Sequence, residues 1–248
     1  MRNYLAPLAL FCLLSLTPST CASEPLASIP FVGCPADGQV GPVAAPKGTT
    51  KQLRISANIA TQLAYYKAEY GPGVLGPRGW SCFEAYGSSG SSLFIAPQPL
   101  NGKSFFSNHN LRLSGPAIQF NTSVGDTSGR FEVAQVAARV FPHLRSLVDD
   151  VIAEDFEPAS DFPSGPYPAD KLIYKSDRLV EFVTPANTTG LGTRNRLAKG
   201  PGDITGFAMI TGEENSLLHL SMRLPSALTG LGPIIIEQAE REAAQPQP

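Results

Sequence analysis

The sequence carries little charge, few cysteines and few histidines for its length. Of its 248 residues only 16% are charged, and 19 Lys and Arg against 21 Asp and Glu leave a formal net charge of -2. Proteins that bind nucleic acids neutralise phosphates with an excess of basic residues, which this composition lacks. We therefore expect no nucleic-acid partner.

Long apolar runs are also scarce, and the longest lies near the N-terminus. Arg2 precedes the apolar run 5–16, and small and polar residues follow, which is the pattern of a secretory signal peptide. This run is too short to span a bilayer, and no later run is long enough. We expect residues 1–22 to be a cleaved signal peptide, no membrane span, and a periplasmic or secreted location. A lipoprotein anchored at Cys21 is the alternative, although residues 18–20 match the usual sequence before such a cysteine poorly.

Only two cysteines, Cys34 and Cys82, lie beyond the expected signal peptide. In an exported chain a single pair predicts one disulfide. The alternative is a Cys82 nucleophile, because residues 80–83 weakly resemble the surroundings of a papain-type cysteine. Such a cysteine opens a helix, whereas residues 82–86 have the pattern of a strand, so we favour the disulfide.

Glycine and proline occur 23 times each, which excludes long helical bundles and indicates many turns. We interpret residues 23–50 as an irregular arm, 51–243 as a single α+β domain and 244–248 as a disordered tail. The spacing of Ile59, Leu63, Tyr66 and Tyr70 predicts a helix that begins at Ser56 and stops at Gly71.

Further elements follow from alternation and apolar stripes. We expect helices over 128–140, 142–152 and 233–243, and strands over 81–86, 92–96, 117–124, 171–174, 179–184, 204–211 and 217–223. The predicted fold class is α+β, with a mainly antiparallel sheet built from hairpins, helices packed on one face and a single disulfide.

The Gly-rich turn 87–91 contains Ser88 and Ser89, which are the first candidates for a serine nucleophile. An α/β-hydrolase elbow needs Gly-x-Ser-x-Gly between a strand and a helix, but Ser91 replaces the second glycine and a strand follows. The histidines, His109, His143 and His219, do not share a metal-ligand spacing. We therefore predict no catalytic residue, no metal site and no cofactor.

Six carboxylates, Asp149, Asp150, Glu154, Asp155, Glu157 and Asp161, lie within one segment without an intervening Lys or Arg. Their spacing does not match an EF-hand loop, so we interpret the segment as a solvated acidic surface. Asn121 and Asn187 begin N-glycosylation acceptor sequences, which matter only in a eukaryotic source.

The segment 190–202 combines four glycines with Arg194, Arg196 and Lys199. Free backbone N–H groups and guanidinium forks suit a phosphate or carboxylate, so these three cations are the candidate anion-binding residues. The alternative is an exposed connection between two hairpins.

Together these patterns predict an exported, non-catalytic binding or envelope-associated protein, whose partner is an unknown small anionic ligand or an envelope or extracellular protein. A secreted serine-type hydrolase that uses Ser88 or Ser89 with one of the histidines is the alternative function. A secreted inhibitor or interaction module is a further alternative.

Overall fold

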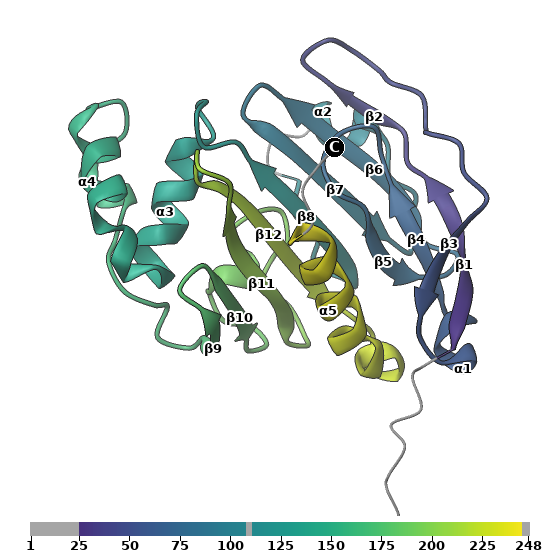
Figure 1. The fold of residues 1–248 in the computed structure, drawn as a ribbon. Helices are drawn as coiled ribbons and strands as arrows, with labels where there is room; N and C mark the ends of the chain where they lie inside the picture. The colour runs from purple at the N-terminus through teal and green to yellow at the C-terminus, as the bar shows by residue number, and fades with distance from the viewer. Residues whose placement is uncertain (1–24, 108–110, 245–248) are drawn as a thin grey trace, which may run out of the picture.

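The computed structural model describes residues 25–107 and 111–244. The expected signal peptide, its Cys21 and residues 245–248 of the expected tail lie outside this part of the chain. The described part forms an eight-stranded sheet and a four-stranded sheet together with five α-helices (Figure 1). In this part of the chain no helix is long and apolar enough to cross a membrane.

The strands are β1 (Leu26–Gly33), β2 (Ala36–Gly38), β3 (Thr50–Arg54), β4 (Leu63–Lys67), β5 (Val74–Pro77), β6 (Ser81–Gly87), β7 (Gly90–Ala96), β8 (Ala117–Ser123), β9 (Lys171–Ser176), β10 (Leu179–Thr184), β11 (Ile204–Thr211) and β12 (Ser216–Arg223). The helices are α1 (Ala57–Ala60), α2 (Gly102–Ser107), α3 (Arg130–Val140), α4 (Arg145–Ala153) and α5 (Gly232–Ala243). Four short 3₁₀ turns complete the described elements: η1 (Pro142–Leu144), η2 (Ala159–Asp161), η3 (Leu191–Thr193) and η4 (Ser226–Leu231).

The larger sheet has the strand order β2-β6-β7-β8-β12-β11-β10-β9, and the smaller sheet has the order β3-β1-β4-β5. All neighbouring strands are antiparallel except the β2–β6 and β1–β4 pairs. The predicted α+β class, mainly antiparallel pairing and single disulfide are confirmed.

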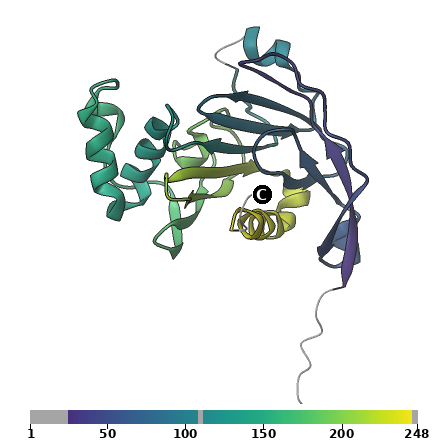
Figure 2. The ribbon, with the colours of Figure 1, turned by 45° about the horizontal axis from the view of Figure 1, so that its top comes forward.

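The large sheet has a buried core on each face. Helices α2, α3 and α4 pack on one face, whereas α5 and the small sheet cover the other, so the helices are not confined to a single face as expected. Figures 1 and 2 show α5 between the small sheet and strands β11 and β12, with α3 and α4 at the far end of the molecule. Successive side chains of a strand point to opposite faces, so one strand contributes to both cores. In β12, Leu217 packs toward α3, whereas Leu218 and Leu220 pack toward α5.

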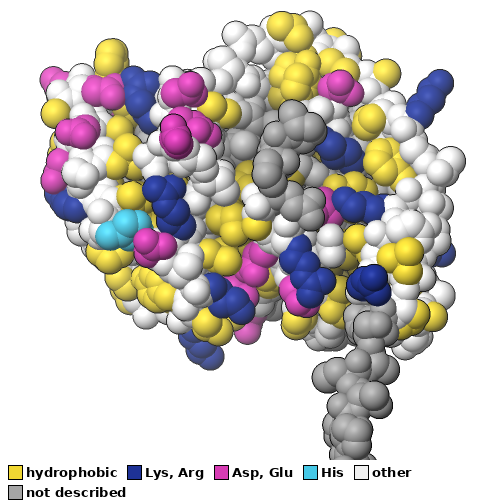
Figure 3. Space-filling model, in the orientation of Figure 1, with side chains coloured by type: hydrophobic (Ala, Val, Ile, Leu, Met, Phe, Trp, Pro, Cys, Tyr) yellow, Lys and Arg dark blue, Asp and Glu magenta, His cyan; other side chains and the backbone are white. Residues whose placement is uncertain are grey.

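Helix α5 is fixed to the small sheet by polar contacts as well as by apolar packing. Glu242 near its end accepts a hydrogen bond from the Tyr65 hydroxyl at 2.7 Å and pairs with the Lys51 ammonium at 2.7 Å. Lys51 also lies 3.8 Å from the centre of the Tyr65 ring. The C-terminal helix is therefore held by strands β3 and β4 from the N-terminal part of the chain. On the face that α5 covers, acidic and basic side chains are interspersed (Figure 3).

The predicted helix from Ser56 to Tyr70 is wrong. Within this segment only α1 is helical. The chain then forms strand β4, which pairs with β1 and β5. The side chains of Leu63 to Tyr66 are all buried, so apolar residues occupy both faces of this strand. A strand buried on both faces also places apolar residues at helical spacings, and one partner of this strand, β1, is distant in sequence.

The segment 23–50 is not irregular throughout. It contains β1, which lies inside the small sheet, and the short β2 at one edge of the large sheet. The sequence patterns predict no helix or strand at the positions of β5 and α2. In β1, Ile29 is fully buried while Pro30 and Gly33 are only partly buried, so glycine and proline mask the strand pattern.

The Cys34–Cys82 disulfide joins the two sheets. Cys34 directly follows β1 and Cys82 lies in β6, with their Cα atoms 5.3 Å apart. Both cysteines are buried, at 0% and 8% exposure. The bond therefore ties the small sheet to the large sheet in the interior, and it leaves no Cys82 thiol to act as a nucleophile.

A buried carboxylate lies between the sheets. Glu84 of β6 is 0% exposed, and its Oε2 accepts a hydrogen bond from the backbone N–H of Tyr70 at 3.0 Å. Gly71 lets this loop lie against the sheet, since its φ is +62° and a Cβ there would be 2.4 Å from the Ser91 hydroxyl. Burial raises the pKa of Glu84 to about 7, although the Lys67 charge acts in the opposite direction.

We expect Glu84→Gln to stabilise the protein at pH 8 by roughly 2 kcal/mol and to change stability little at pH 4. The folded chain holds a proton on Glu84 that the unfolded chain releases, so stability is lost as pH rises from about 4.5 to 7. Urea unfolding across this range tests the difference between wild type and variant. Burial also raises the pKa of Glu240 to about 7, but Glu240 contributes the same pH dependence to wild type and variant. Parallel curves of unfolding free energy against pH would therefore contradict the role assigned to Glu84.

Candidate functional site

A polar cleft lies on the face of the large sheet that α2 and α3 cover. It consists of two adjoining hollows of about 500 Å³ and 530 Å³, which share Ala85, Ser92 and Asn195. The first hollow lies beside the start of α3 and includes Ser89, Asn121, Ser123, Ser128, Phe131, Glu132, Gln135 and Glu157. The second lies beside α2 and includes Phe94, Phe105, Phe106, Arg112, Gln119 and Arg196.

The floor of the cleft follows from strand register. Ser92 of β7 is paired with Asn121 of β8, and Asn121 is paired with His219 of β12, so three polar residues form a row across the sheet. Gln119 and Ser221 form part of the next row. Residues two apart in a strand share a face, which brings all of these side chains to the side of α3.

The side-chain amides of the floor have fixed orientations. Gln119 donates from Nε2 to Asn121 Oδ1 at 2.9 Å, and its Oε1 accepts from the backbone N–H of Arg196 at 2.9 Å. Gln119 can satisfy both bonds in one orientation only, and Asn121 must then direct its Nδ2 group away from Gln119. Asn121 lines the cleft, so this NH₂ group is a donor for a bound molecule.

His219 contacts the third amide, that of Asn195. Its Nδ1 lies 3.5 Å from Asn195 Nδ2, and its Nε2 lies 3.3 Å from the Ser221 hydroxyl. Burial first, and the charge of Arg194 second, lower the pKa of His219 to about 3, so the imidazole is neutral. With Asn195 Nδ2 directed at His219, Nδ1 accepts and Nε2 carries the hydrogen, and this arrangement presents Asn195 Oδ1 as an acceptor at the cleft.

Charged side chains form the wall on the α3 side. Arg194 bonds Glu132 through Nε at 3.1 Å and Nη2 at 2.7 Å, and it also donates to the side chain of Gln135. Gln135 in turn donates to Glu157 Oε2 at 2.7 Å. Among the described residues no cation pairs with Glu157, so this end of the cleft keeps a negative charge.

The opposite end of the cleft is cationic. Exposed Arg112 donates from Nη1 to the backbone oxygens of Thr193 and Asn195, and in the described part of the chain its Nε and Nη2 have no partner. Arg196 lies next to it and donates from Nη1 to Leu111 O at 3.2 Å. The aromatic rings of Phe105 and Phe106 complete this end.

The structure separates the three cations of the segment 190–202. Arg194 is committed to Glu132, Arg196 lines the cleft and Lys199 is exposed outside it. Backbone N–H groups of this segment are also used, because Leu191 donates to Asp170 Oδ2 at 2.8 Å and Gly192 donates to Thr184 Oγ1 at 3.0 Å. Joint anion binding by Arg194, Arg196 and Lys199 stays a prediction. Arg112 also lies at the cleft, and no sequence pattern identifies it as a candidate.

The serine candidates have no histidine partner among the described residues. Ser88 and Ser89 are exposed in the β6–β7 turn, and Ser89 reaches the rim of the cleft. His143 is exposed at η1, and His109 lies outside the described residues. The Ser221–His219–Asn195 series has the order of a catalytic relay, but Ser221 is only 3% exposed and lines neither hollow of the cleft.

We expect a fluorophosphonate probe to label neither the wild-type protein nor Ser89→Ala. A nucleophilic serine needs a base within hydrogen-bond reach, and Ser88 and Ser89 have no such base in the described structure. Mass spectrometry of the intact protein after incubation with the probe makes the measurement. Labelling of wild type that disappears in Ser88→Ala or Ser89→Ala would contradict this expectation and favour the hydrolase.

The acidic segment borders the cleft. Asp149 pairs with Arg145, and Glu154 pairs with Arg130. Across the described chain, no three His, Cys, Asp or Glu side chains are grouped to hold a metal ion.

Of the two potential glycosylation sites, Asn187 is exposed, whereas Asn121 is 6% exposed and forms part of the floor.

Comparison of the chain with protein-family models, curated proteins and solved structures finds no match. We therefore infer function from the geometry of the cleft.

Proposed function

We propose that this protein is an exported, non-catalytic binding protein that holds a small polar molecule in the cleft. The observation that carries the proposal is the row of polar side chains on its floor. Asn121 Nδ2, Asn195 Oδ1 and the Ser92 hydroxyl face a cleft of the size that small ligands occupy; Gln119 fixes the Asn121 amide, and His219 contacts the Asn195 amide.

A buried polar network costs stability unless it is satisfied, and a polar row on a strand face is more simply replaced by apolar residues. Here α3 and the loop 190–202 lie over a polar patch beside the apolar core of that face. Ligand binding accounts for that arrangement. The expected signal peptide and the disulfide support an extracytoplasmic location.

The anionic ligand expected from the sequence fits one end of the cleft, where Arg112 and Arg196 lie. Arg194 has a different role in this proposal, because it holds Glu132 and Gln135 in the wall. A hydrolase is less consistent with the cleft, whose serines have no histidine beside them in the described structure.

Saturation-transfer NMR with a mixture of neutral sugars, amino acids, tripeptides and dicarboxylates tests the proposal. Ser92 lines both hollows, so Ser92→Trp fills the point where they meet. Ser28→Trp is the matched control, because Ser28 is an exposed strand serine in the small sheet. We expect transfer to at least one compound with wild type and Ser28→Trp but not with folded Ser92→Trp. If no compound depends on Ser92, the proposal is wrong.

A further inference from the structure

The floor of the cleft pairs one donor with one acceptor. Asn121 offers Nδ2 hydrogens, because Gln119 occupies its Oδ1, and Asn195 presents Oδ1, with its Nδ2 directed at His219. A peptide group carries one C=O acceptor and one N–H donor, which complement this pair. Ser92, with one donor and two lone pairs, lies between the hollows and serves either group.

The ends of the cleft have opposite charge. Glu157 lies at one end, its Oε2 already bonded to Gln135, and the acidic segment 149–161 adds negative charge nearby. Arg112 lies at the other end with two nitrogens without partners in the described structure. This separation differs from the interspersed charges on the face that α5 covers (Figure 3).

We propose that the ligand is a short peptide with free ends, bound with its amino group at Glu157 and its carboxylate at Arg112. This inference rests on the proposed function, since it names the ligand class of the same cleft. Carboxylates bind guanidinium groups through charge-assisted hydrogen bonds, and capture of a peptide terminus is a recurring mode of recognition.

Other polar ligands fit the cleft less completely. A neutral sugar satisfies the amides but leaves both charged ends without a partner. A dicarboxylate places one anion beside Glu157, which is repulsive. A peptide matches the floor through its backbone, and the rings of Phe105 and Phe106 offer apolar contact to its side chains. Both the acidic end and the basic end then have a function.

Calorimetric titration with trialanine, N-acetyl-trialanine and trialanine amide tests the orientation. We expect each cap to weaken binding about fivefold or more, because it removes one charged terminus. In Glu157→Gln the acetylated and free peptides should bind alike, and in Arg112→Gln the amidated and free peptides should bind alike. Glu157→Gln thus removes the affinity loss caused by the acetyl cap and keeps the loss caused by the amide cap, and Arg112→Gln does the reverse.

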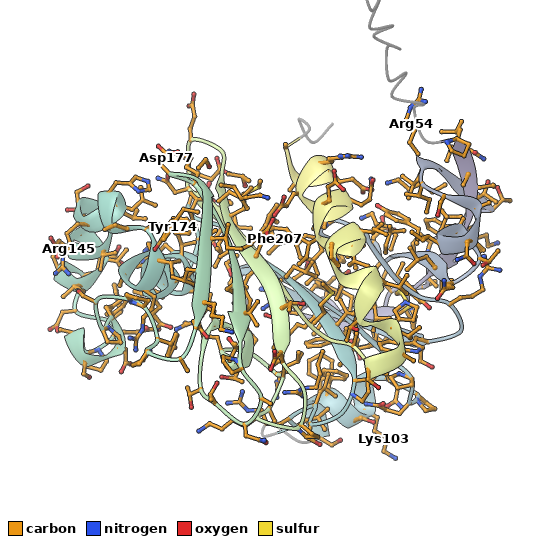
Figure 4. All side chains as sticks on the ribbon, turned by 90° about the horizontal axis from the view of Figure 1, so that it is seen from below. Arg54, Lys103, Arg145, Tyr174, Asp177 and Phe207 are labelled. Carbon is orange, nitrogen blue, oxygen red and sulfur yellow. A yellow bond between two sulfur atoms is a disulfide. The ribbon has the colours of Figure 1, made fainter. Side chains whose placement is uncertain are left out.

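Matched controls change exposed charges outside the cleft. Arg54→Gln and Asp177→Asn alter residues of β3 and the β9–β10 turn, which Figure 4 labels on the periphery, and both penalties should persist. Equal affinity for the three peptides, or no affinity for any, overturns the peptide assignment. If sugars or dicarboxylates then still show Ser92-dependent transfer, the proposed function stands. If no compound does, the proposed function fails too.

Discussion

Replacing Arg223 by methionine is expected to lower the free energy of unfolding by about 4 kcal/mol. Arg223 lies in β12, is 3% exposed, and has no carboxylate partner in the described structure. Its guanidinium instead donates to backbone carbonyls of two loops, including Ser114 at 3.0 Å, Gly115 at 3.3 Å and Gly202 at 3.4 Å. Methionine fills similar space but leaves these buried acceptors without a donor.

Chemical unfolding monitored by circular dichroism measures the loss. Arg178→Met is the control, because exposed Arg178 donates to a single carbonyl, that of Gly212, and we expect less than about 0.5 kcal/mol there. The two loops that Arg223 joins continue into Arg112 and Arg196, so folded Arg223→Met should also lose ligand transfer in the NMR assay. A loss below about 1 kcal/mol would show that the carbonyls find other donors.

Removing the disulfide with Cys34→Ala and Cys82→Ala is expected to cost about 4 kcal/mol, since the bond closes a loop across a separation of 48 residues in the unfolded chain. The bond also joins β6 to the end of β1, so amide exchange should accelerate first in the small sheet. Denaturant unfolding of wild type, with and without reductant, and of the double variant makes the comparison.

Wild type under reducing conditions should match the double variant, apart from the small effect of the two lost sulfur atoms. In the absence of reductant, the native mass should be about 2 Da below that of the free dithiol form, because bond formation removes two hydrogens. Rapid alkylation of Cys82 in the native protein, or unchanged stability of the double variant, would contradict the role assigned to the bond.

Much of the fold can be predicted because its strongest patterns are local. The hairpins β6–β7, β9–β10 and β11–β12 have alternating strands around short turns, and α5 has an apolar stripe after a proline at its start. The disulfide follows from the count of cysteines beyond the expected signal peptide. The small sheet is different, because its central pair is not local. Strand β1 pairs in parallel with β4, and β2, β3 and α1 lie between them in the chain.

The cleft could not be located from the sequence, because Ser92, Asn121 and Asn195 come from separate segments that only strand register brings together. A usable signal does exist in β8 and β12. Gln119 and Asn121 alternate with buried apolar residues, as do His219 and Ser221. Such alternation ordinarily indicates a solvent-facing side, and only the tertiary structure reveals that α3 and a loop cover it.

The position of α5 has a consequence for the order in which the protein folds. Its Ile235, Ile236 and Ala239 complete a core that also contains Ile29 and Leu63 of the small sheet. If the chain is exported as proposed and crosses a membrane from its N-terminus, those early strands emerge long before the helix that covers them. Until residues up to Glu242 have emerged, the apolar side of both sheets stays open to chaperones and proteases. Under the proposed export, the fold is therefore completed late, when α5 follows the strands that it covers.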